Sequence, residues 1–362
     1  MARLPGTLWV RRIALWVCDV GRMHGPADGG RAKRPMPYAR IIGTGSYAPA
    51  KVLTNYDLEK VVDTTDEWIR TRTGISERRI TTEAEATSDL AYEASIRALA
   101  EAGVDPADLD MILVATVTPD MFFPSTACVL QDRLGSRRAA AMDISAACSG
   151  FIYGLAVADG LLRLGTMRNV LLVGAETLTK IVNWKDRNTC VLFGDGAGAA
   201  VLRLGEGERG ILSVHLFADG GKGSQLMMPG GGSRFPISQR VVEEGLAAIQ
   251  MNNGNEVFKV AVRAMEDAAI AALKHNQLDI SDVDLLVPHQ ANLRIIDAVG
   301  QRLGLTEDKV CVNIQRYGNT SAASIPLALD EAIQAGRVKP GDLLLLCAFG
   351  GGLTWGSALI RW

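Results

Sequence analysis

The stretch Asp108-Leu-Asp-Met-Ile-Leu-Val-Ala115 decides the fold, because a similar stretch, Asp282-Val-Asp-Leu-Leu-Val-Pro-His289, begins 174 residues later. A second pair, Asn169-Val-Leu-Leu-Val-Gly-Ala175 and Asp342-Leu-Leu-Leu-Leu-Cys-Ala348, is separated by 173 residues. A third pair, starting at Gly198 and Gly356, is separated by 158 residues. The nearly constant spacing of the first two pairs indicates an internal duplication. Two related halves are therefore predicted, with a cleft where they meet.

Each half alternates short apolar runs with longer helical patterns. The runs that predict buried strands are residues 112–115, 139–144, 170–173, 285–287 and 343–346. Helices are expected over residues 88–102, 150–164, 257–273, 293–303 and 322–335. This alternation is typical of α/β proteins whose strands are covered by helices on both faces. We place the first half at residues 38–210 and the second at residues 211–362.

Residues 1–37 differ from the rest of the chain. Two arginines, Arg11 and Arg12, split an apolar run, and a stretch rich in Gly, Arg and Pro follows, which matches a signal peptide poorly. We interpret this segment as a disordered extension or as the product of an upstream start codon. A targeting peptide is the alternative.

Composition narrows the classes of function. The formal net charge is -2, so attraction of the whole protein to nucleic acid is not indicated. No apolar run approaches the roughly 20 residues needed to span a bilayer. The six cysteines and four histidines are dispersed, without the spacing of a metal site or a disulfide framework. We therefore expect free thiols in the cytoplasm and neither metal, membrane nor nucleic acid as a partner.

Cys148 lies in Ser145-Ala-Ala-Cys-Ser-Gly150, between a predicted strand and a predicted helix. The start of a helix presents free N–H groups and the positive end of a dipole, which favour a thiolate. The small neighbours leave room for a substrate. The alternative is a buried structural cysteine, which is the usual fate of a lone Cys.

His289 and Asn319 are the other candidate catalytic residues. His289 follows a buried strand, the place where α/β folds keep their sites, although a core histidine satisfied by hydrogen bonds is the alternative. Asn319 lies in a turn of small residues that enters a helix, where an ordinary turn or cap residue is the alternative. Gly350-Gly-Gly352 follows a strand, and glycines let backbone N–H groups approach a ligand closely.

Residues 38–362 closely resemble the β-ketoacyl-[acyl carrier protein] synthase III family, the initiating condensing enzymes of type II fatty acid synthesis. The matching stretches include Asp66-Glu-Trp-Ile-Arg-Thr-Arg-Thr-Gly-Ile75, Phe193-Gly-Asp-Gly-Ala-Gly-Ala-Ala200, Val287-Pro-His-Gln-Ala-Asn-Leu-Arg294, Gly318-Asn-Thr-Ser-Ala-Ala-Ser324 and Phe349-Gly-Gly-Gly352. The resemblance implies the thiolase fold, an αβαβα sandwich of two related halves, as a homodimer. This agrees with the duplication found above.

The resemblance also implies a mechanism. Cys148 takes an acyl group from a short acyl-CoA, with the backbone N–H groups of Cys148 and Gly351 as the oxyanion hole. Malonyl-[acyl carrier protein] then loses CO₂, with His289 and Asn319 stabilising the enolate, and the resulting carbanion attacks the acyl group. These donors replace a Lewis acid, so no metal and no cofactor beyond the two thioester substrates is expected.

Further residues are assigned by the same resemblance. Trp68, Arg72, Arg187 and Asn292 are expected to bind the CoA nucleotide and its pantetheine arm. Lys259 and Arg294 are expected to dock the acidic acyl carrier protein, with a solvated helix face as the alternative. Phe123 is expected to close the acyl pocket of the partner subunit, and its bulk favours acetyl-CoA as the primer.

Other functions were weighed against this one. A related ketosynthase of secondary metabolism would share the Cys-His-Asn set, and dependence on malonyl-[acyl carrier protein] separates the two. A non-catalytic subunit that only binds carrier protein would lack the nucleophile, and Cys148 is present. A thiolase would need a second catalytic cysteine, but Cys347 closes an apolar strand and is interpreted as part of the core. A thioester hydrolase would need a group that activates water, and none is visible beside Cys148.

Overall fold

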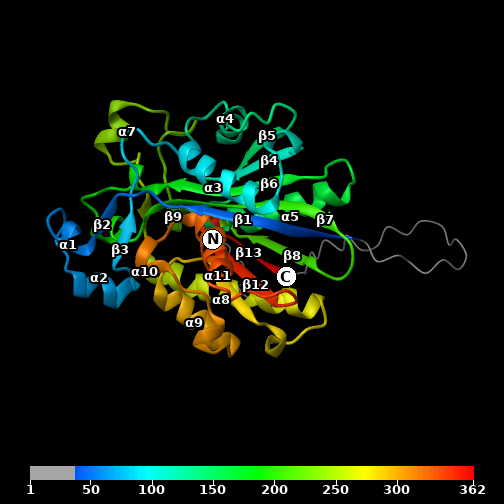
Figure 1. Ribbon diagram of the computed structural model, residues 1–362. Helices are drawn as coiled ribbons and strands as arrows, with labels where there is room; N and C mark the ends of the chain where they lie inside the picture. The colour runs from blue at the N-terminus through cyan, green and yellow to red at the C-terminus, as the bar shows by residue number, and fades with distance from the viewer. Residues whose placement is uncertain (1–36) are drawn as a thin grey trace, which may run out of the picture. The chain divides into compact units, whose positions relative to one another are not determined.

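The computed structural model describes residues 37–362, so the interpretation of residues 1–37 lies outside the described residues except for Pro37. Residues 37–362 form one compact unit built on two sheets (Figure 1). Within the described range, no helix is both long and apolar enough to cross a membrane.

The first sheet is drawn entirely from the N-terminal part of the described chain. Its strand order is β1 (Tyr38–Tyr47), β7 (Asp195–Gly205), β6 (Val170–Thr177), β4 (Met111–Ala115), β5 (Ala140–Ile144). Strand β4 runs parallel to both β5 and β6, whereas β7 runs antiparallel to both β1 and β6.

The second sheet repeats this arrangement. Its order is β8 (Gly210–Ala218), β13 (Thr354–Arg361), β12 (Leu343–Gly350), β11 (Leu285–Pro288). Strand β13 is antiparallel to β8 and β12, and β11 is parallel to β12. A parallel bridge between Leu286 and Val310 occupies the place of the fifth strand. The duplicated sandwich expected from the sequence is confirmed, while the boundary after residue 210 stays a prediction.

Five layers follow from the way the apolar faces pack. Helices α3 (Thr87–Ala102) and α4 (Thr126–Arg133) cover the outer face of the first sheet. Helices α5 (Gly150–Arg163) and α11 (Ser324–Gln334) lie between the two sheets and share one core with both. Helices α8 (Gly254–His275) and α9 (Leu293–Leu303) cover the outer face of the second sheet (Figure 1).

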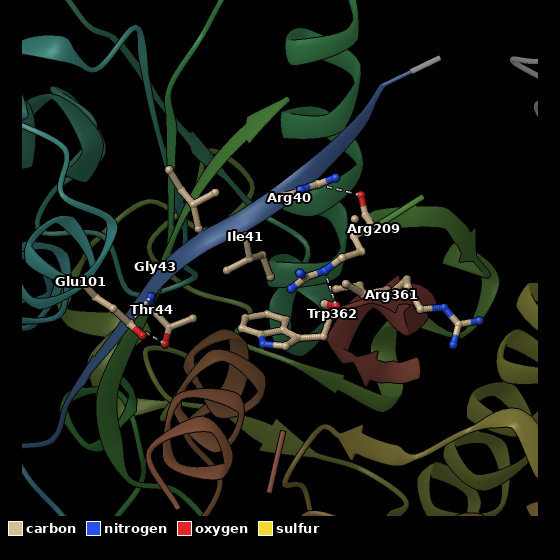
Figure 2. Close-up of a pocket in the computed structure, with 11 residues that line it drawn as sticks. Arg40, Ile41, Gly43, Thr44, Glu101, Arg209, Arg361 and Trp362 are labelled. Carbon is tan, nitrogen blue, oxygen red and sulfur yellow. Dashed lines mark hydrogen bonds between the residues drawn. The ribbon is translucent and has the colours of Figure 1, made fainter. Parts of the chain in front are cut away.

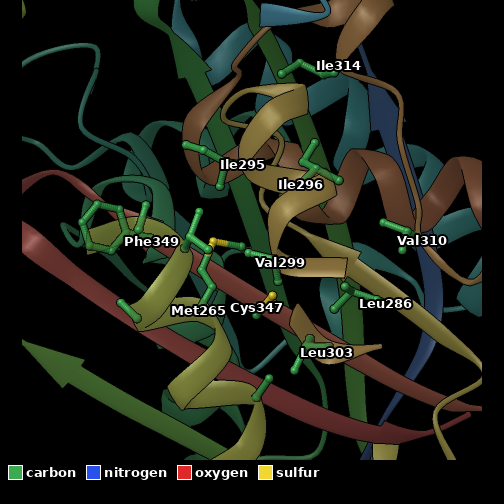
Figure 3. Close-up of a cluster of buried hydrophobic side chains, with 14 of the residues drawn as sticks. Met265, Leu286, Ile295, Ile296, Val299, Leu303, Val310, Ile314, Cys347 and Phe349 are labelled. Atoms are coloured by element: carbon green, nitrogen blue, oxygen red, sulfur yellow. The ribbon is translucent and has the colours of Figure 1, made fainter. Parts of the chain in front are cut away.

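Burial on both faces explains why the predicted strands read as continuous apolar runs. In β12, Leu344 and Leu346 face the central helices, whereas Leu345 and Cys347 face α8 and α9. The successive side chains of a strand point to opposite faces, so a strand with helices on each side must be apolar throughout. Cys347 is fully buried in the outer cluster that Figure 3 shows, which confirms it as a core residue.

Smaller elements complete the chain. They are β2 (Val52–Thr54), α1 (Asn55–Leu58), α2 (Asp66–Thr73), β3 (Glu77–Arg79), α6 (Arg187–Cys190), β9 (Leu226–Met227), α7 (Gln239–Glu243), β10 (Gln250–Met251) and α10 (Ile314–Tyr317). Short 3-10 turns precede the two central helices: η2 (Ala147–Ser149) leads into α5, and η7 (Ser321–Ala323) leads into α11. The predicted helix over residues 322–335 is thus a 3-10 turn followed by α11.

The two 3-10 turns are related by the duplication. Ala147 and Ser321, 174 residues apart, both have left-handed backbone conformations, with φ of 45° and 49°. Each turn is contacted by a strand of the opposite sheet. Gly174 of β6 packs on the backbone of Ala322, and a Cβ at Gly350 of β12 would lie 2.6 Å from the nitrogen of Cys148. Glycine at both strand positions is therefore required by close packing.

We predict that Gly174→Ala lowers the free energy of unfolding by about 1–3 kcal/mol, because the added methyl group meets the Ala322 carbonyl, which is backbone and cannot rotate away. The matched control is Gly160→Ala in α5, where a Cβ would meet nothing within 4 Å. The control should leave stability unchanged or raise it by roughly 1 kcal/mol through helix propensity. Urea unfolding followed by circular dichroism compares the two, and equal midpoints would contradict the packing argument.

Candidate active site

Cys148 lies in the 3-10 turn that runs into α5, at the crossing of the two sheets. The left-handed Ala147 turns the chain so that Cys148 faces the second sheet, where β12 ends. Only 7% of the Cys148 residue is exposed. The expected position at a helix start is confirmed, with the difference that the last turn before α5 is 3-10.

Two backbone N–H groups point at the Cys148 sulfur. They belong to Cys148 itself and to Gly351, the first residue of the turn η8 (Gly351–Leu353), and both hydrogen-bond to the thiol. Gly350 allows this approach because a side chain there would overlap the nitrogen atoms of Cys148 and Ser149. Two converging donors beside a nucleophile can stabilise a negative oxygen that forms on an attacked carbonyl group.

The thiolate expected at the helix start is not supported by the structure. Burial raises the pKa of the Cys148 thiol to about 11, although the N–H groups of Cys148 and Gly351 and the hydroxyl of Ser321 each lower it. The negative charge of Glu176 raises it further. Desolvation penalises the charged form more than the nearby donors favour it. The resting residue is therefore a thiol at neutral pH.

His289 follows β11 directly, and its ring is fully enclosed. Its backbone N–H donates to the Cys347 carbonyl at 2.8 Å, which joins it to β12. On the ring, Nδ1 lies 2.7 Å from the Ser324 hydroxyl, whereas the buried Nε2 has no partner within the described chain. Burial lowers the pKa of His289 to about 3. The imidazole is thus neutral, with one nitrogen held and the other free for a ligand.

Asn319 is held on both sides of its backbone. Its N–H donates to the Leu192 carbonyl at 2.8 Å, and its own carbonyl accepts from Gly194 at 3.0 Å. The side-chain Oδ1 accepts the Ser321 N–H at 2.9 Å. No described residue accepts a hydrogen bond from the Asn319 Nδ2 group. The amide is therefore oriented with its donor end unused.

The segment from Asn319 to Ser324 connects all three candidate catalytic residues. Ser321 orients the Asn319 amide through its N–H and approaches Cys148 through its hydroxyl, and Ser324 holds His289. These two serines were not singled out from the sequence. Glu176, fully buried at the end of β6, was also missed, although a lone acidic residue in the apolar run of residues 170–177 is a signal that could have found it.

The residues assigned to the nucleotide also gather in one place. The guanidinium of Arg187 lies 4.9 Å from the centre of the Trp68 ring, and that of Arg72, also on α2, lies 6.0 Å from it. Asn292, the N-cap of α9, donates from Nδ2 to the Arg72 carbonyl at 3.0 Å. An indole between two cations, with one amide fixed beside them, can stack on a base and bind phosphate.

The two residues assigned to docking lie on neighbouring helices. Lys259 on α8 and Arg294 on α9 are both exposed, and the Arg294 guanidinium lies 5.3 Å from the ring centre of Phe258. The structure therefore brings two positive charges to one surface, near the start of each helix.

Phe123 is not brought to the candidate site of its own chain. It is 85% exposed, and its neighbour Phe122 is 74% exposed. Phe122 also lines a shallow apolar pocket with Ile237, which is 77% exposed. This loop is left without a partner in the single chain.

Other parts of the described chain offer no competing site. A cavity beside β1, lined by Arg40, Thr44, Glu101, Arg209 and Trp362 among others, contains none of the predicted site residues (Figure 2). Within residues 37–362, no cluster of three or more His, Cys, Asp or Glu side chains is arranged to hold a metal ion.

Comparison with known proteins agrees on one family. Models described as 3-oxoacyl-[acyl-carrier-protein] synthase III and its C-terminal part match residues 142–220 and 273–362. The beta-ketoacyl-[acyl-carrier-protein] synthase III of Caldanaerobacter subterraneus is 61% identical over 90% of this chain and 98% of its own length. The solved 3-oxoacyl-[acyl-carrier-protein] synthase III of Aquifex aeolicus is 51% identical, with a TM-score of 0.84 over 90% of this chain and 100% of that chain. A solved priming beta-ketosynthase of a polyketide biosynthetic pathway is 37% identical, with a TM-score of 0.84 over 92% of this chain and 98% of that chain.

We predict that the alkylation of Cys148 by iodoacetamide, without any thioester present, still accelerates between pH 8 and pH 10. The thiolate is the reacting form, and burial holds the pKa of Cys148 at about 11, so its fraction grows about tenfold per pH unit in this range. Mass spectrometry of the Cys148 peptide gives the rate, with the exposed Cys128 peptide of the same sample reporting on the reagent. A rate that levels off below pH 8 would show that the helix start outweighs burial.

Proposed function

Because the chain belongs to the 3-oxoacyl-[acyl-carrier-protein] synthase III family, we propose that it condenses a short acyl-CoA, acetyl-CoA above all, with malonyl-[acyl carrier protein]. The product is a 3-ketoacyl-[acyl carrier protein], which begins type II fatty acid biosynthesis. The observation that carries this proposal is the enclosed thiol, with two N–H groups aimed at it and an oriented imidazole and amide joined to it through residues 319–324. The lower identity to the polyketide ketosynthase favours this function over secondary metabolism.

In the first half-reaction, Cys148 attacks the carbonyl carbon of the acyl-CoA thioester. The N–H groups of Cys148 and Gly351 converge on the sulfur, so an oxygen on the attacked carbon would lie within their reach. Negative charge that develops on that oxygen is stabilised by donors that need not reorient. CoA leaves, and the acyl group stays on Cys148 as a thioester.

In the second half-reaction, malonyl-[acyl carrier protein] loses CO₂ and its carbanion attacks the acyl group on Cys148. The thioester oxygen of malonyl becomes an enolate, and the free Nε2 of His289 and Nδ2 of Asn319 can each donate to it. His289 must be neutral with its proton on Nε2, which fits a ring whose pKa burial lowers to about 3 and whose Nδ1 can accept the Ser324 hydroxyl. The chemistry needs no cofactor besides the two thioesters.

Trp68, Arg72, Arg187 and Asn292 support the binding of CoA. The contact between Arg187 and Trp68 indicates that an adenine would enter between the guanidinium and the indole. The exposed charges of Lys259 and Arg294 support docking of an acidic carrier protein that delivers the same pantetheine arm. The reaction consumes free thiol, which fits a reducing compartment such as the cytoplasm.

A homodimer is supported by the apolar loop around Phe123. The exposed rings of Phe122 and Phe123, with Ile237 nearby, form the kind of surface that usually marks a protein interface. A second copy would cover this loop and receive Phe123 at its acyl pocket, where the ring limits primer length.

We expect Cys148→Ser to abolish the 42 Da acetyl adduct that acetyl-CoA leaves on the wild-type protein, a mass that follows from exchange of the thiol hydrogen for an acetyl group. Asn319→Ala should keep the adduct but slow malonyl decarboxylation by about 10²–10³-fold, because one enolate donor is lost. Intact mass spectrometry and CO₂ release separate the two steps. Undiminished decarboxylation by Asn319→Ala would remove the role proposed for the amide.

For the primer, we expect acetyl-CoA to be turned over at least about tenfold more efficiently than octanoyl-CoA, because Phe123 fills the end of the pocket. Isobutyryl-CoA serves as the branched comparison. Phe123→Ala should narrow the difference by raising kcat/KM for octanoyl-CoA, and it should not change the rate of acetyl transfer markedly. A wild-type preference for octanoyl-CoA would reject the proposed pocket.

A further inference from the structure

Glu176 is a buried carboxyl group to which the mechanism above gives no role. It is fully enclosed at the end of β6 and makes no ion pair within residues 37–362. The Thr118 hydroxyl donates to it at 2.6 Å, the Val117 N–H at 3.1 Å and the Thr116 hydroxyl at 3.2 Å. An acidic group held by neutral donors in a dry interior is costly to keep, which calls for an explanation.

The backbone places Glu176 beside the turn that carries Ser321. Gly174, two residues earlier on the same face of β6, packs directly on the backbone of Ala322 and Ala323. Glu176 therefore faces the same turn. By the 174-residue repeat, Glu176 corresponds to Gly350, which packs on the turn of Cys148. The first half thus has a carboxyl group where the second half has only a glycine.

Ser321 lies between Glu176 and Cys148. Its hydroxyl is buried, is close enough to both groups to lower the pKa of each, and makes no fully formed hydrogen bond with either in the resting structure. Its left-handed backbone is held by the N–H donated to Asn319. The hydroxyl can therefore rotate between the two groups while its backbone stays fixed.

The acid-base properties of the surrounding groups leave few proton acceptors for the thiol. Burial raises the pKa of Glu176 to about 7, whereas it lowers that of His289 to about 3. The remaining carboxylate packed against β6, Asp195 of β7, is occupied by donors from Thr81 and Thr179. Of the ionisable groups facing Cys148, Glu176 is the one whose basicity suits a proton acceptor at neutral pH.

We propose that Ser321 and Glu176 form a proton relay that deprotonates Cys148 during acylation. The Cys148 thiol gives its proton to the Ser321 oxygen as the Ser321 hydroxyl gives its own to the Glu176 carboxylate. The bond from Sγ to the acyl carbon forms, and the bond from that carbon to the CoA sulfur breaks. The proton then returns from Glu176 through Ser321 to the departing CoA sulfur, so free CoA leaves as a thiol and Glu176 is again a carboxylate.

Two readouts test this relay in Glu176→Gln. The rate of acetyl transfer from acetyl-CoA in a single turnover, followed by intact mass, should fall about 100-fold at pH 7, because the acceptor is lost. Alkylation of Cys148 by iodoacetamide should instead shift to lower pH, because the negative charge that raises the pKa of Cys148 is removed. A merely structural role would move both rates in the same direction, and that outcome, or an acetyl transfer rate within threefold of wild type, would overturn the relay.

Ser321→Ala gives a second test that keeps the backbone intact. Alanine already occupies the equivalent left-handed position at residue 147, so the turn accommodates it. Acetyl transfer should fall about as far as in Glu176→Gln, whereas malonyl decarboxylation should persist, because the N–H donated to Asn319 remains. Ser324→Ala is the matched control, since its hydroxyl serves His289 and its loss should impair decarboxylation and spare acetyl transfer. Identical defects in the two serine variants would contradict the relay.

The relay rests on Cys148 being the acylated residue, and its failure can be told apart from failure of that proposal. An acetyl adduct on another residue would reject the proposed function. An adduct on Cys148 that forms at the normal rate in both Glu176→Gln and Ser321→Ala would reject the relay alone.

Discussion

The close approach of two 3-10 turns to the strands of the opposite sheets is the constraint on which the rest of the structure depends. Gly174 meets the backbone of Ala322, and Gly350 meets the nitrogen of Cys148, so each half inserts a strand end against the turn of the other. Any side chain at these glycines would push the sheets apart. The contact brings the sulfur, the oxyanion donors and the segment from Asn319 to Ser324 into one enclosed space.

Enclosure changes the charges of that space more than any single neighbour does. Burial is the largest influence on Cys148, Glu176 and His289, and in each case it favours the neutral form. A dry site strengthens the hydrogen bonds that stabilise an oxyanion or enolate. The same dryness withholds the water that would otherwise take the thiol proton. A site of this kind therefore has to transfer protons through its own side chains.

Several elements could be predicted from local sequence signals. Helix α9 (Leu293–Leu303) has the predicted bounds, and the runs that predicted β4, β6 and β12 were recognisable because strands covered on both faces are apolar throughout. The position of Cys148 between strand and helix was also predictable. Its ionisation was not, because the helix start is a local feature, whereas the burial that raises its pKa comes from β12 and η7, far along the chain. Ser321 and Ser324 were missed because only the fold gives them Cys148 and His289 as partners.

The sequence by itself determined the repeated order of strands and helices, the family, and the residue types available for acyl transfer. It could do so because these depend on periodicity, spacing and motifs read along the chain. Only the tertiary structure decided which groups face one another: the free Nε2 of His289, the oriented amide of Asn319, and Glu176 beside Ser321. The reason is that packing between the two halves sets distance and dielectric environment, and neither is a property of residues adjacent in sequence.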